Sequence, residues 1–249
     1  MANKLIWTDE DKFFITTFNK RLYNDYAYKF LQTYAETKQT IKMICYVEED
    51  YQYPNYTGVT YVNLPQEMPE LVAFKKRHKD KIWHDDSDFL QNAVRFSHKV
   101  FAQYHASKLG KKFMWLDADN IFMKQFPDNY MDTFIPDDVF VTFYGRDHYT
   151  ECGVIGFNCK DKDSKQFFDL YLSHYTEDKI YNMVNKTDCH AFDNTRNMIK
   201  PKERNKNDGH GGHIIARDKE INPYIDHKKG KRKYKDNSPE WVRQTNESR

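Results

Sequence analysis

The chain has 249 residues, of which 39 are Lys or Arg and 37 are Asp or Glu, so its formal net charge is only +2. A balance this close singles out no nucleic acid, membrane or other class of partner. The length suits one α/β domain or two small ones. Because no Gly/Ser/Pro-rich linker interrupts the pattern, we expect a single domain over residues 1–236, followed by a tail over residues 237–249.

No segment of the sequence predicts insertion into a membrane. The N-terminus lacks an apolar stretch of signal-peptide length, and no run is long enough to span a bilayer. The four cysteines lack a metal-site spacing such as CxxC and are expected to be reduced thiols. We therefore expect a soluble, cytoplasmic protein in which the Asn-x-Ser/Thr matches at Asn55, Asn185 and Asn246 arise by chance. The sequence gives no indication of the oligomeric state.

The first part of the chain predicts alternating strands and helices. Lys12–Phe18 is rich in β-branched and aromatic residues and predicts a buried strand. Arg21–Glu36 places its apolar residues near one face of a helix. Thr40–Val47 and Val59–Val62 predict two further strands. This succession is typical of the start of an open, mostly parallel sheet.

After a polar stretch, the pattern continues in the second part. Apolar residues at helical spacing predict a helix over Asp88–Leu109, with Gly110 as a plausible end. Three strands are predicted next: Lys112–Leu116, Val139–Tyr144 and Gly153–Asn158. A helix over Ser164–Tyr175 follows, and the pattern weakens after Tyr181.

Two carboxylates follow directly after a predicted hydrophobic strand. Asp117 and Asp119 form a DxD motif at the end of Lys112–Leu116, the place where open α/β sheets bind ligands. Two charged carboxylates this close repel each other unless a cation lies between them. Such a cation is what a departing nucleotide diphosphate needs, because it takes up the developing charge. The alternative is a solvated turn, since DxD is common by chance.

A second motif lies close to the C-terminus. His227, Gly230 and Lys233 form an HxxGxxK pattern within a basic run. Downstream of a strand-terminal DxD, this pattern resembles the GT-A glycosyltransferases of the glycogenin and lipopolysaccharide galactosyltransferase type. The resemblance implies an α/β fold with a Rossmann-like open mixed sheet flanked by helices. It further implies transfer of a hexose, with glucose the expected sugar, from a UDP-sugar donor to an acceptor hydroxyl.

The resemblance also assigns roles to these residues. Asp117 and Asp119 would bind the metal and Asp117 would also contact the donor, while His227 would be the third protein ligand. Oxygen ligands favour Mn²⁺ or Mg²⁺, and the imidazole favours Mn²⁺. Gly230 would let the backbone approach the diphosphate, and Lys233 would bind it.

Two acidic residues between the motifs are candidates for catalysis by the same resemblance. Glu151 begins a segment similar to the family's Asn-(Ala/Ser)-Gly segment, which faces the sugar, but Glu replaces the expected Asn. Asp188 lies where such enzymes keep an acidic residue near the anomeric carbon. Cys189 replaces the usual Gln after it, and Asp193 is a rival. The HxxGxxK pattern favours retention of configuration, whereas inversion would require Asp188 or Glu151 to deprotonate the acceptor.

Further donor contacts are expected from two places. Arg95 and Lys99 lie one helical turn apart, where the family has a basic residue that contacts the donor phosphates or sugar. A solvated helix face is the alternative for both. Thr16, Phe18 and Asn19 end the first predicted strand, where the nucleotide base docks in the family.

Other classes of protein could use the same residues. A two-metal nuclease or phosphatase could use Asp117 and Asp119, but it would need more carboxylates close by. A sugar-nucleotide pyrophosphorylase is set aside because Thr16–Arg21 contains no glycine. A nucleic-acid-binding module without catalysis could use the basic run together with Tyr234 and Trp241.

The acceptor is the least defined part of the prediction. Tyr144-Gly145-Arg146, shortly before Glu151, resembles the glucosyltransferases that modify hydroxymethylated pyrimidines in DNA, including the base J type. The basic segments Lys75–Lys81 and Lys228–Lys235 agree with DNA, because such an enzyme needs cations beside the pocket that receives the extruded base. We expect hydroxymethylated DNA as the acceptor, with a glycan or lipopolysaccharide as the alternative.

Overall fold

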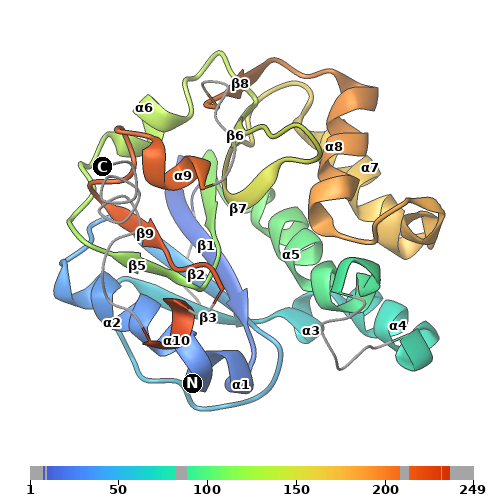
Figure 1. Cartoon of the computed structure of the whole chain (residues 1–249), viewed down its shortest axis with the longest axis horizontal. Coiled ribbons are helices and arrows are strands. Elements are labelled where there is room, and N and C mark those ends of the chain that lie inside the picture. The colour runs from blue at the N-terminus through green and yellow to red at the C-terminus, as the bar shows by residue number, and fades with distance from the viewer. Residues whose placement is uncertain (1–7, 9, 82–88, 208–212, 231, 236–249) are drawn as a thin grey trace, which may run out of the picture.

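A computed structural model describes residues 8, 10–81, 89–207, 213–230 and 232–235. Seven of its strands form one sheet in the order β3-β2-β1-β4-β7-β6-β8 (Figure 1). These strands are β1 (Lys12–Phe18), β2 (Lys42–Val47), β3 (Val59–Asn63), β4 (Lys112–Leu116), β6 (Val141–Tyr144), β7 (Glu151–Asn158) and β8 (Glu203–Asn205). The pairs formed by β7 are antiparallel and the other pairs are parallel. The predicted α/β class, with an open mixed sheet flanked by helices, is confirmed.

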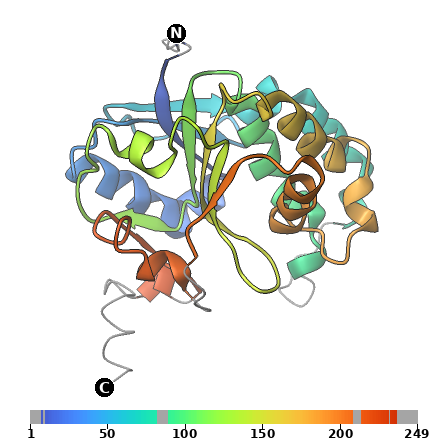
Figure 2. The same ribbon diagram turned by 90° about the horizontal axis from the view of Figure 1, so that it is seen from above.

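Helices cover both faces of this sheet (Figure 2). One face packs against α3 (Leu64–Glu67), α4 (Pro69–Arg77), α5 (Ala93–Ala106), α7 (Ser164–Thr176) and α8 (Asp188–Ile199). The other packs against α2 (Tyr28–Glu36), α6 (Tyr130–Phe134) and α9 (Ile214–Arg217). Successive side chains of β1 enter opposite cores, with Phe13 in the first and Phe14 in the second. Burial on both faces explains why the strands are continuous hydrophobic runs.

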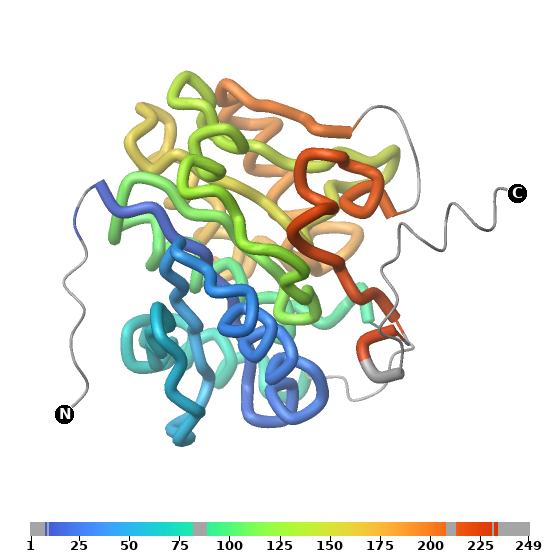
Figure 3. The backbone as a smooth tube through the Cα atoms, turned by 90° about the vertical axis from the view of Figure 1, so that its left-hand side faces the viewer, coloured from blue at the N-terminus to red at the C-terminus, as the bar shows by residue number. Residues whose placement is uncertain are grey.

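A small second sheet joins the C-terminal part of the chain to the middle. Strand β5 (Asn120–Phe122) pairs antiparallel with β9 (Ile225–His227). Figure 3 shows this C-terminal segment, in red, returning beside the green segment that follows β4. The short helix α10 (Arg232–Lys235) comes after β9. The pairing of β5 with β9 therefore brings two distant parts of the sequence together beyond the carboxyl end of β4.

The predicted elements agree with the structure where hydrophobic runs are unbroken. The predicted bounds of β1 and β4 are those observed. The first predicted helix is α1 (Lys20–Leu22), a π-helical turn (Tyr23–Ala27) and α2 in succession. The predicted long helix before β4 is shorter, because Asn92 caps α5 and Phe89–Gln91 forms a 3-10 turn. The 3-10 turns Lys79–Lys81 and Lys179–Asn182 complete the described helices.

Several elements were not predicted from the sequence. They are α3, α4, β5, α6, α8, β8, α9, β9 and α10. Helix α8 matters most for function, because Asp188 is its first residue and Thr187 caps it by accepting a hydrogen bond from the backbone N–H of His190. Within the described ranges, no helix is long and apolar enough to cross a membrane.

Candidate active site

The DxD motif lies at the crevice where the strand order reverses. β1 pairs with β2 on one side and with β4 on the other, so ligands are expected beyond the carboxyl ends of β1 and β4. Asp117 follows β4 directly, and its backbone N–H donates to the carbonyl of Gly153 at 2.9 Å. The side chain of Asn120 donates to the carbonyl of Asp117 at 2.6 Å. These bonds hold the turn that presents both carboxylates.

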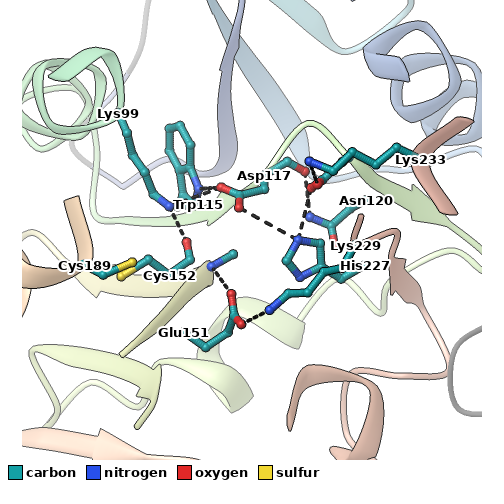
Figure 4. Close-up of polar contacts among 12 residues, drawn as sticks. Lys99, Trp115, Asp117, Asn120, Glu151, Cys152, Cys189, His227, Lys229 and Lys233 are labelled. Atoms are coloured by element: carbon teal, nitrogen blue, oxygen red, sulfur yellow. Dashed lines mark hydrogen bonds and ion pairs between the residues drawn. The ribbon is translucent and has the colours of Figure 1, made fainter. Parts of the chain in front are cut away.

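His227 is brought to this turn by the second sheet. In the β5–β9 register, His227 lies opposite Asn120, next to Asp119 in the sequence. The backbone N–H of Lys228 donates to the carbonyl of Asp119 at 3.0 Å. The imidazole Nε2 then lies 3.1 Å from Asp119 Oδ1 and 3.9 Å from Asp117 Oδ2 (Figure 4). The structure thus brings together the three residues that the sequence assigned to a metal.

These three side chains fit a divalent cation, and we call them the metal group. One ligand atom from each of Asp117, Asp119 and His227 lies within 4.8 Å of the other two. Asp119 and His227 are buried, and Asp119 Oδ1 and His227 Nδ1 have no hydrogen-bond partner among the described residues. Burial alone raises the pKa of Asp119, but His227 and Lys233 outweigh it and hold the pKa below its usual range. Two carboxylates and an imidazole suit Mn²⁺ and leave further positions for oxygen ligands.

The absence of a side chain at Gly153 makes room for His227. A Cβ at this position would lie 2.4 Å from His227 Cε1 and 2.8 Å from Nδ1. We therefore expect Gly153→Ala to displace the imidazole and to weaken Mn²⁺ binding about ten- to hundredfold, as loss of ligand orientation does elsewhere. Calorimetric titration with Mn²⁺ measures this. Gly145→Ala is the control, because the side chain that it meets is the amide of Asn205, outside the metal group. Equal affinities in both variants would contradict the prediction.

Lys99 links the metal group to a third carboxylate. Its side chain is buried, and its ammonium lies 3.1 Å from Asp117 Oδ1 and 2.9 Å from Asp188 Oδ2. It also donates to the carbonyl of Cys152. Burial lowers the pKa of Lys99, but the carboxylates of Asp117 and Asp188 outweigh it and raise the pKa above its ordinary value. Asp188 therefore belongs to the same site as the DxD motif.

Trp115 is a site residue that sequence reasoning missed. Its indole Nε1 donates to Asp117 Oδ1 at 2.6 Å. Lys99 lies over the same ring, 4.8 Å from its centroid. A signal was present, because residues two apart in a strand point to the same side, so Trp115 faces the way Asp117 does.

Arg95 and Lys99 differ, although they are one turn apart on α5. Arg95 is exposed, and its guanidinium lies 4.7 Å from the centroid of the Phe89 ring. Lys99 is 8% exposed and points at the carboxylates. The structure therefore brings Lys99, but not Arg95, to the metal group.

The three residues predicted to hold the nucleotide base also differ. Thr16 and Phe18 are fully buried, and Phe18 packs against Tyr23 and Tyr53 in the core. Both side chains lie inside the protein in this structure, and their contact with a base stays a prediction. Asn19 is half-buried and caps α1, its side chain accepting a hydrogen bond from the backbone N–H of Leu22. Of the three, Asn19 alone reaches the surface.

Glu151 lies on the other side of His227. Its carboxylate accepts a hydrogen bond from the backbone N–H of Gly153 at 3.1 Å. Arg146 and Lys229 both form ion pairs with it. Lys229 lies inside the HxxGxxK pattern, but this contact was not predicted from the sequence. One buried carboxylate thus faces two cations at the edge of the site.

The C-terminal motif lies against the metal group. Lys233 Nζ is 2.6 Å from Asp119 Oδ2 and 5.1 Å from the centroid of the Tyr26 ring. Tyr26 comes from the π-helical turn and, with Asp119 and Lys233, lines a small hollow. Gly230 has a φ of +57°, which favours glycine, and no described atom lies within 4 Å of where its Cβ would be. The backbone at Gly230 is therefore not covered by any described atom, and it lies close to Lys233 and the DxD motif.

The two basic segments do not lie together. Figures 1 and 2 agree in placing α4 and α10 well apart, so the two basic segments do not both lie beside one pocket. Lys75 lies 3.8 Å from Glu48, and Arg77 is 3.0 Å from Asp178. These cations join α4 to neighbouring parts of the protein. Trp241 and the predicted tail over 237–249 lie outside the described residues.

Comparisons with known proteins give similarity of structure only. No protein-family model matches the sequence, and no curated protein matches it. The apo structure of the bifunctional glycosyltransferase WbbM is similar, with a TM-score of 0.48 and 10% identity over 82% of this chain. The present chain spans 40% of that protein's length. Mouse xyloside xylosyltransferase 1 in its apo form has a TM-score of 0.48 and 11% identity, over 76% of this chain and 82% of that one. Similarity at this level carries no information on activity.

Proposed function

We propose that the chain is a metal-dependent glycosyltransferase of the GT-A type that transfers a hexose from a UDP-sugar to an acceptor hydroxyl. The observation that carries the proposal is the convergence of Asp117, Asp119 and His227 within 4.8 Å, beside Lys233. A cation there, when bound, stabilises the charge that develops on a departing diphosphate. Mn²⁺ is the metal that the two carboxylates and the imidazole favour.

The residues around this group divide the work of binding the donor. Lys233 binds the diphosphate and neutralises part of its charge. Gly230 lets the backbone approach the same phosphates. Lys99 holds Asp117 and Asp188 in place through contacts of 3.1 and 2.9 Å. Asn19 contacts the nucleotide base from the end of β1.

The two remaining carboxylates lie on different sides of the site. Asp188 is joined to the metal group through Lys99, so we place it beside the anomeric carbon of the donor sugar. Glu151 lies beyond His227 with Arg146 and Lys229, so we place it on the acceptor side. A carboxylate at either place acts on the acceptor hydroxyl or on the charge of the sugar.

Hydrolysis of the donor in the absence of an acceptor tests the proposal. Purified protein incubated with UDP-glucose or UDP-galactose should release UDP in the presence of Mn²⁺, and the release should stop when the metal is chelated. Detection of UDP by coupled assay measures this. Failure to bind or hydrolyse any UDP-sugar with either Mn²⁺ or Mg²⁺ would contradict the proposed function.

Removal of the Lys233 side chain tests whether the C-terminal motif binds the diphosphate. Lys233→Ala is expected to weaken UDP binding about ten- to hundredfold, because a lysine–phosphate contact in a partly dry site contributes about 1.5–3 kcal/mol. Calorimetric titration with UDP and Mn²⁺ measures the loss. Lys165→Ala is the control, since Lys165 forms an ion pair with Asp169 on the exposed side of α7, outside the site. Equal UDP affinities in both variants would show that the C-terminal motif does not hold the diphosphate.

We further propose a hydroxymethylated pyrimidine in DNA as the acceptor. Support comes from the edge of the site, where Arg146 lies between the Glu151 carboxylate and the Tyr149 ring, 5.5 Å from its centroid. Tyr149 in turn packs on His190 at 5.3 Å. A guanidinium next to an aromatic ring suits a phosphate and an extruded base.

A direct comparison of acceptors tests this second proposal. Hydroxymethylated duplex DNA should accept labelled sugar, and its apparent affinity should fall with salt, with a log–log slope of about −0.9 per neutralised phosphate. Unmodified duplex of the same sequence is the control. Transfer to a small saccharide but not to hydroxymethylated DNA would favour a glycan acceptor and overturn the DNA proposal, while leaving the glycosyltransferase proposal intact.

A further inference from the structure

Two thiols meet beside the candidate active site. Cys152 is the second residue of β7 and is 2% exposed, whereas Cys189 is the second residue of α8 and is half-buried. Their sulfur atoms and a carboxylate oxygen of Asp188 all lie within 4.8 Å of one another. Figure 4 shows the two sulfurs facing each other, next to Lys99. These residues come from elements far apart in the sequence, so the fold itself creates the pair.

Two thiols and a carboxylate also form a candidate metal site, but the surrounding charge disfavours one. The ammonium of Lys99 lies 2.9 Å from Asp188 Oδ2 and donates to the carbonyl of Cys152. The negative charge of Asp188 is therefore already balanced, and a divalent cation would be placed against a buried positive charge. The pair is better suited to a reaction of its two sulfurs with each other.

We propose that Cys152 and Cys189 are an oxidation site that forms a reversible disulfide under peroxide. Cys189 is the sulfur that an oxidant reaches, because it is the more exposed of the two. Hydrogen peroxide converts its thiol to a sulfenic acid and releases one water. The Cys152 sulfur then attacks the sulfenic sulfur, and the departing hydroxide takes up the Cys152 proton as a second water. Two electrons pass from the thiols to the peroxide.

Formation of this bond would move the carboxylate between the two elements. The sulfurs must approach to about 2.05 Å, and the Cβ–S–S–Cβ dihedral must turn to about 90°. The first turn of α8 is thereby drawn against β7. Asp188 precedes Cys189 and is held by Lys99 alone among the cations described here, so its carboxylate shifts relative to the metal group. A misplacement of about 1 Å lowers turnover about 10²-fold. This last step rests on the proposed function, whereas the disulfide does not.

Peptide mapping of the oxidised protein tests the site. The full chain is treated with hydrogen peroxide, its remaining thiols are blocked, and it is digested with trypsin without reduction. The expected product joins residues 147–160, which contain both Cys152 and Cys159, to residues 187–196, which contain Cys189. Dithiothreitol should separate the two peptides. Cys189 oxidised to the sulfinic acid with no cross-link would overturn the proposal.

Single substitutions identify the sulfur on the first peptide. The cross-link should persist in Cys159→Ser and disappear in Cys152→Ser and in Cys189→Ser. Thermal unfolding of the reduced variants shows whether each one is folded. A cross-link that survives Cys152→Ser, or disappears in folded Cys159→Ser, would overturn the assignment. UDP release by oxidised protein, before and after dithiothreitol, then reports the effect on turnover. If reduced protein releases no UDP, the proposed function fails and the mapping result stands.

Discussion

Asp119→Asn is expected to lower metal-dependent turnover by at least about 10²-fold, because it removes a charged ligand that helps to stabilise the departing diphosphate. Asp119 Oδ1 lies 3.1 Å from His227 Nε2, and its Oδ2 lies 2.6 Å from Lys233. The substitution keeps the shape of the side chain but removes the negative charge that faces Lys233 and the His227 imidazole. Turnover of a UDP-sugar at limiting Mn²⁺ measures the effect.

A matched substitution separates this effect from a general loss of charge. Asp169→Asn changes an exposed carboxylate on α7 that forms an ion pair with Lys165, four residues earlier. It should leave turnover and Mn²⁺ affinity unchanged. Both variants should unfold in a single transition, which shows that the fold is intact. If Asp119→Asn and Asp169→Asn turn over alike at limiting Mn²⁺, the metal assignment is wrong.

Lys99→Met is expected to destabilise the fold by about 3–5 kcal/mol, because removal of one partner leaves the buried carboxylate of Asp188 uncompensated. Asp117 and Asp188 both face this ammonium, and Asp188 is 2% exposed. Methionine keeps the length of the side chain, so the lost charge accounts for most of the effect. Urea unfolding at neutral pH measures the free energy of unfolding.

The pH dependence of this loss of stability follows from the direction in which the pKa of Lys99 is shifted. Its pKa in the folded protein is raised, so the stabilisation is fully present below the unfolded value of about 10.4 and is lost as the pH rises through the folded value. The difference between wild type and Lys99→Met should therefore stay constant from pH 6 to about pH 9 and shrink above that. Lys165→Met is the control, since that exposed pair contributes little. Equal unfolding free energies for wild type and Lys99→Met would contradict the ion-pair account.

Much of the sheet could be predicted because its strands are buried on both faces. Such strands are rich in apolar and β-branched residues, and the predicted bounds of β1 and β4 are those observed. Helices α4 and α8 carry a weaker signal. α4 buries only Leu71 and Phe74, and the buried residues of α8 include few large apolar side chains. Sparse apolar residues leave the helical period hard to detect.

The metal group was predictable from chemistry, but its surroundings depend on packing. Acidic and imidazole side chains in two motifs indicate a cation wherever the fold brings them together. The exposure of a strand end is different, because it depends on what covers the strand. Phe18 ends β1 yet is buried by Tyr23 and Tyr53, which come from other parts of the chain. Spacing along α5 likewise could not show that Lys99 turns inward while Arg95 faces solvent.

The pairing of β5 with β9 also sets an order in time during synthesis. The last strand of the seven-stranded sheet ends at Asn205, whereas His227 ends β9. At about 5–20 residues per second, the ribosome adds His227 a second or more after the sheet has all its strands. A nascent chain therefore contains all seven strands of the main sheet before it contains His227, the third member of the proposed metal group. Any metal that needs all three side chains can be captured only after β9 has been made.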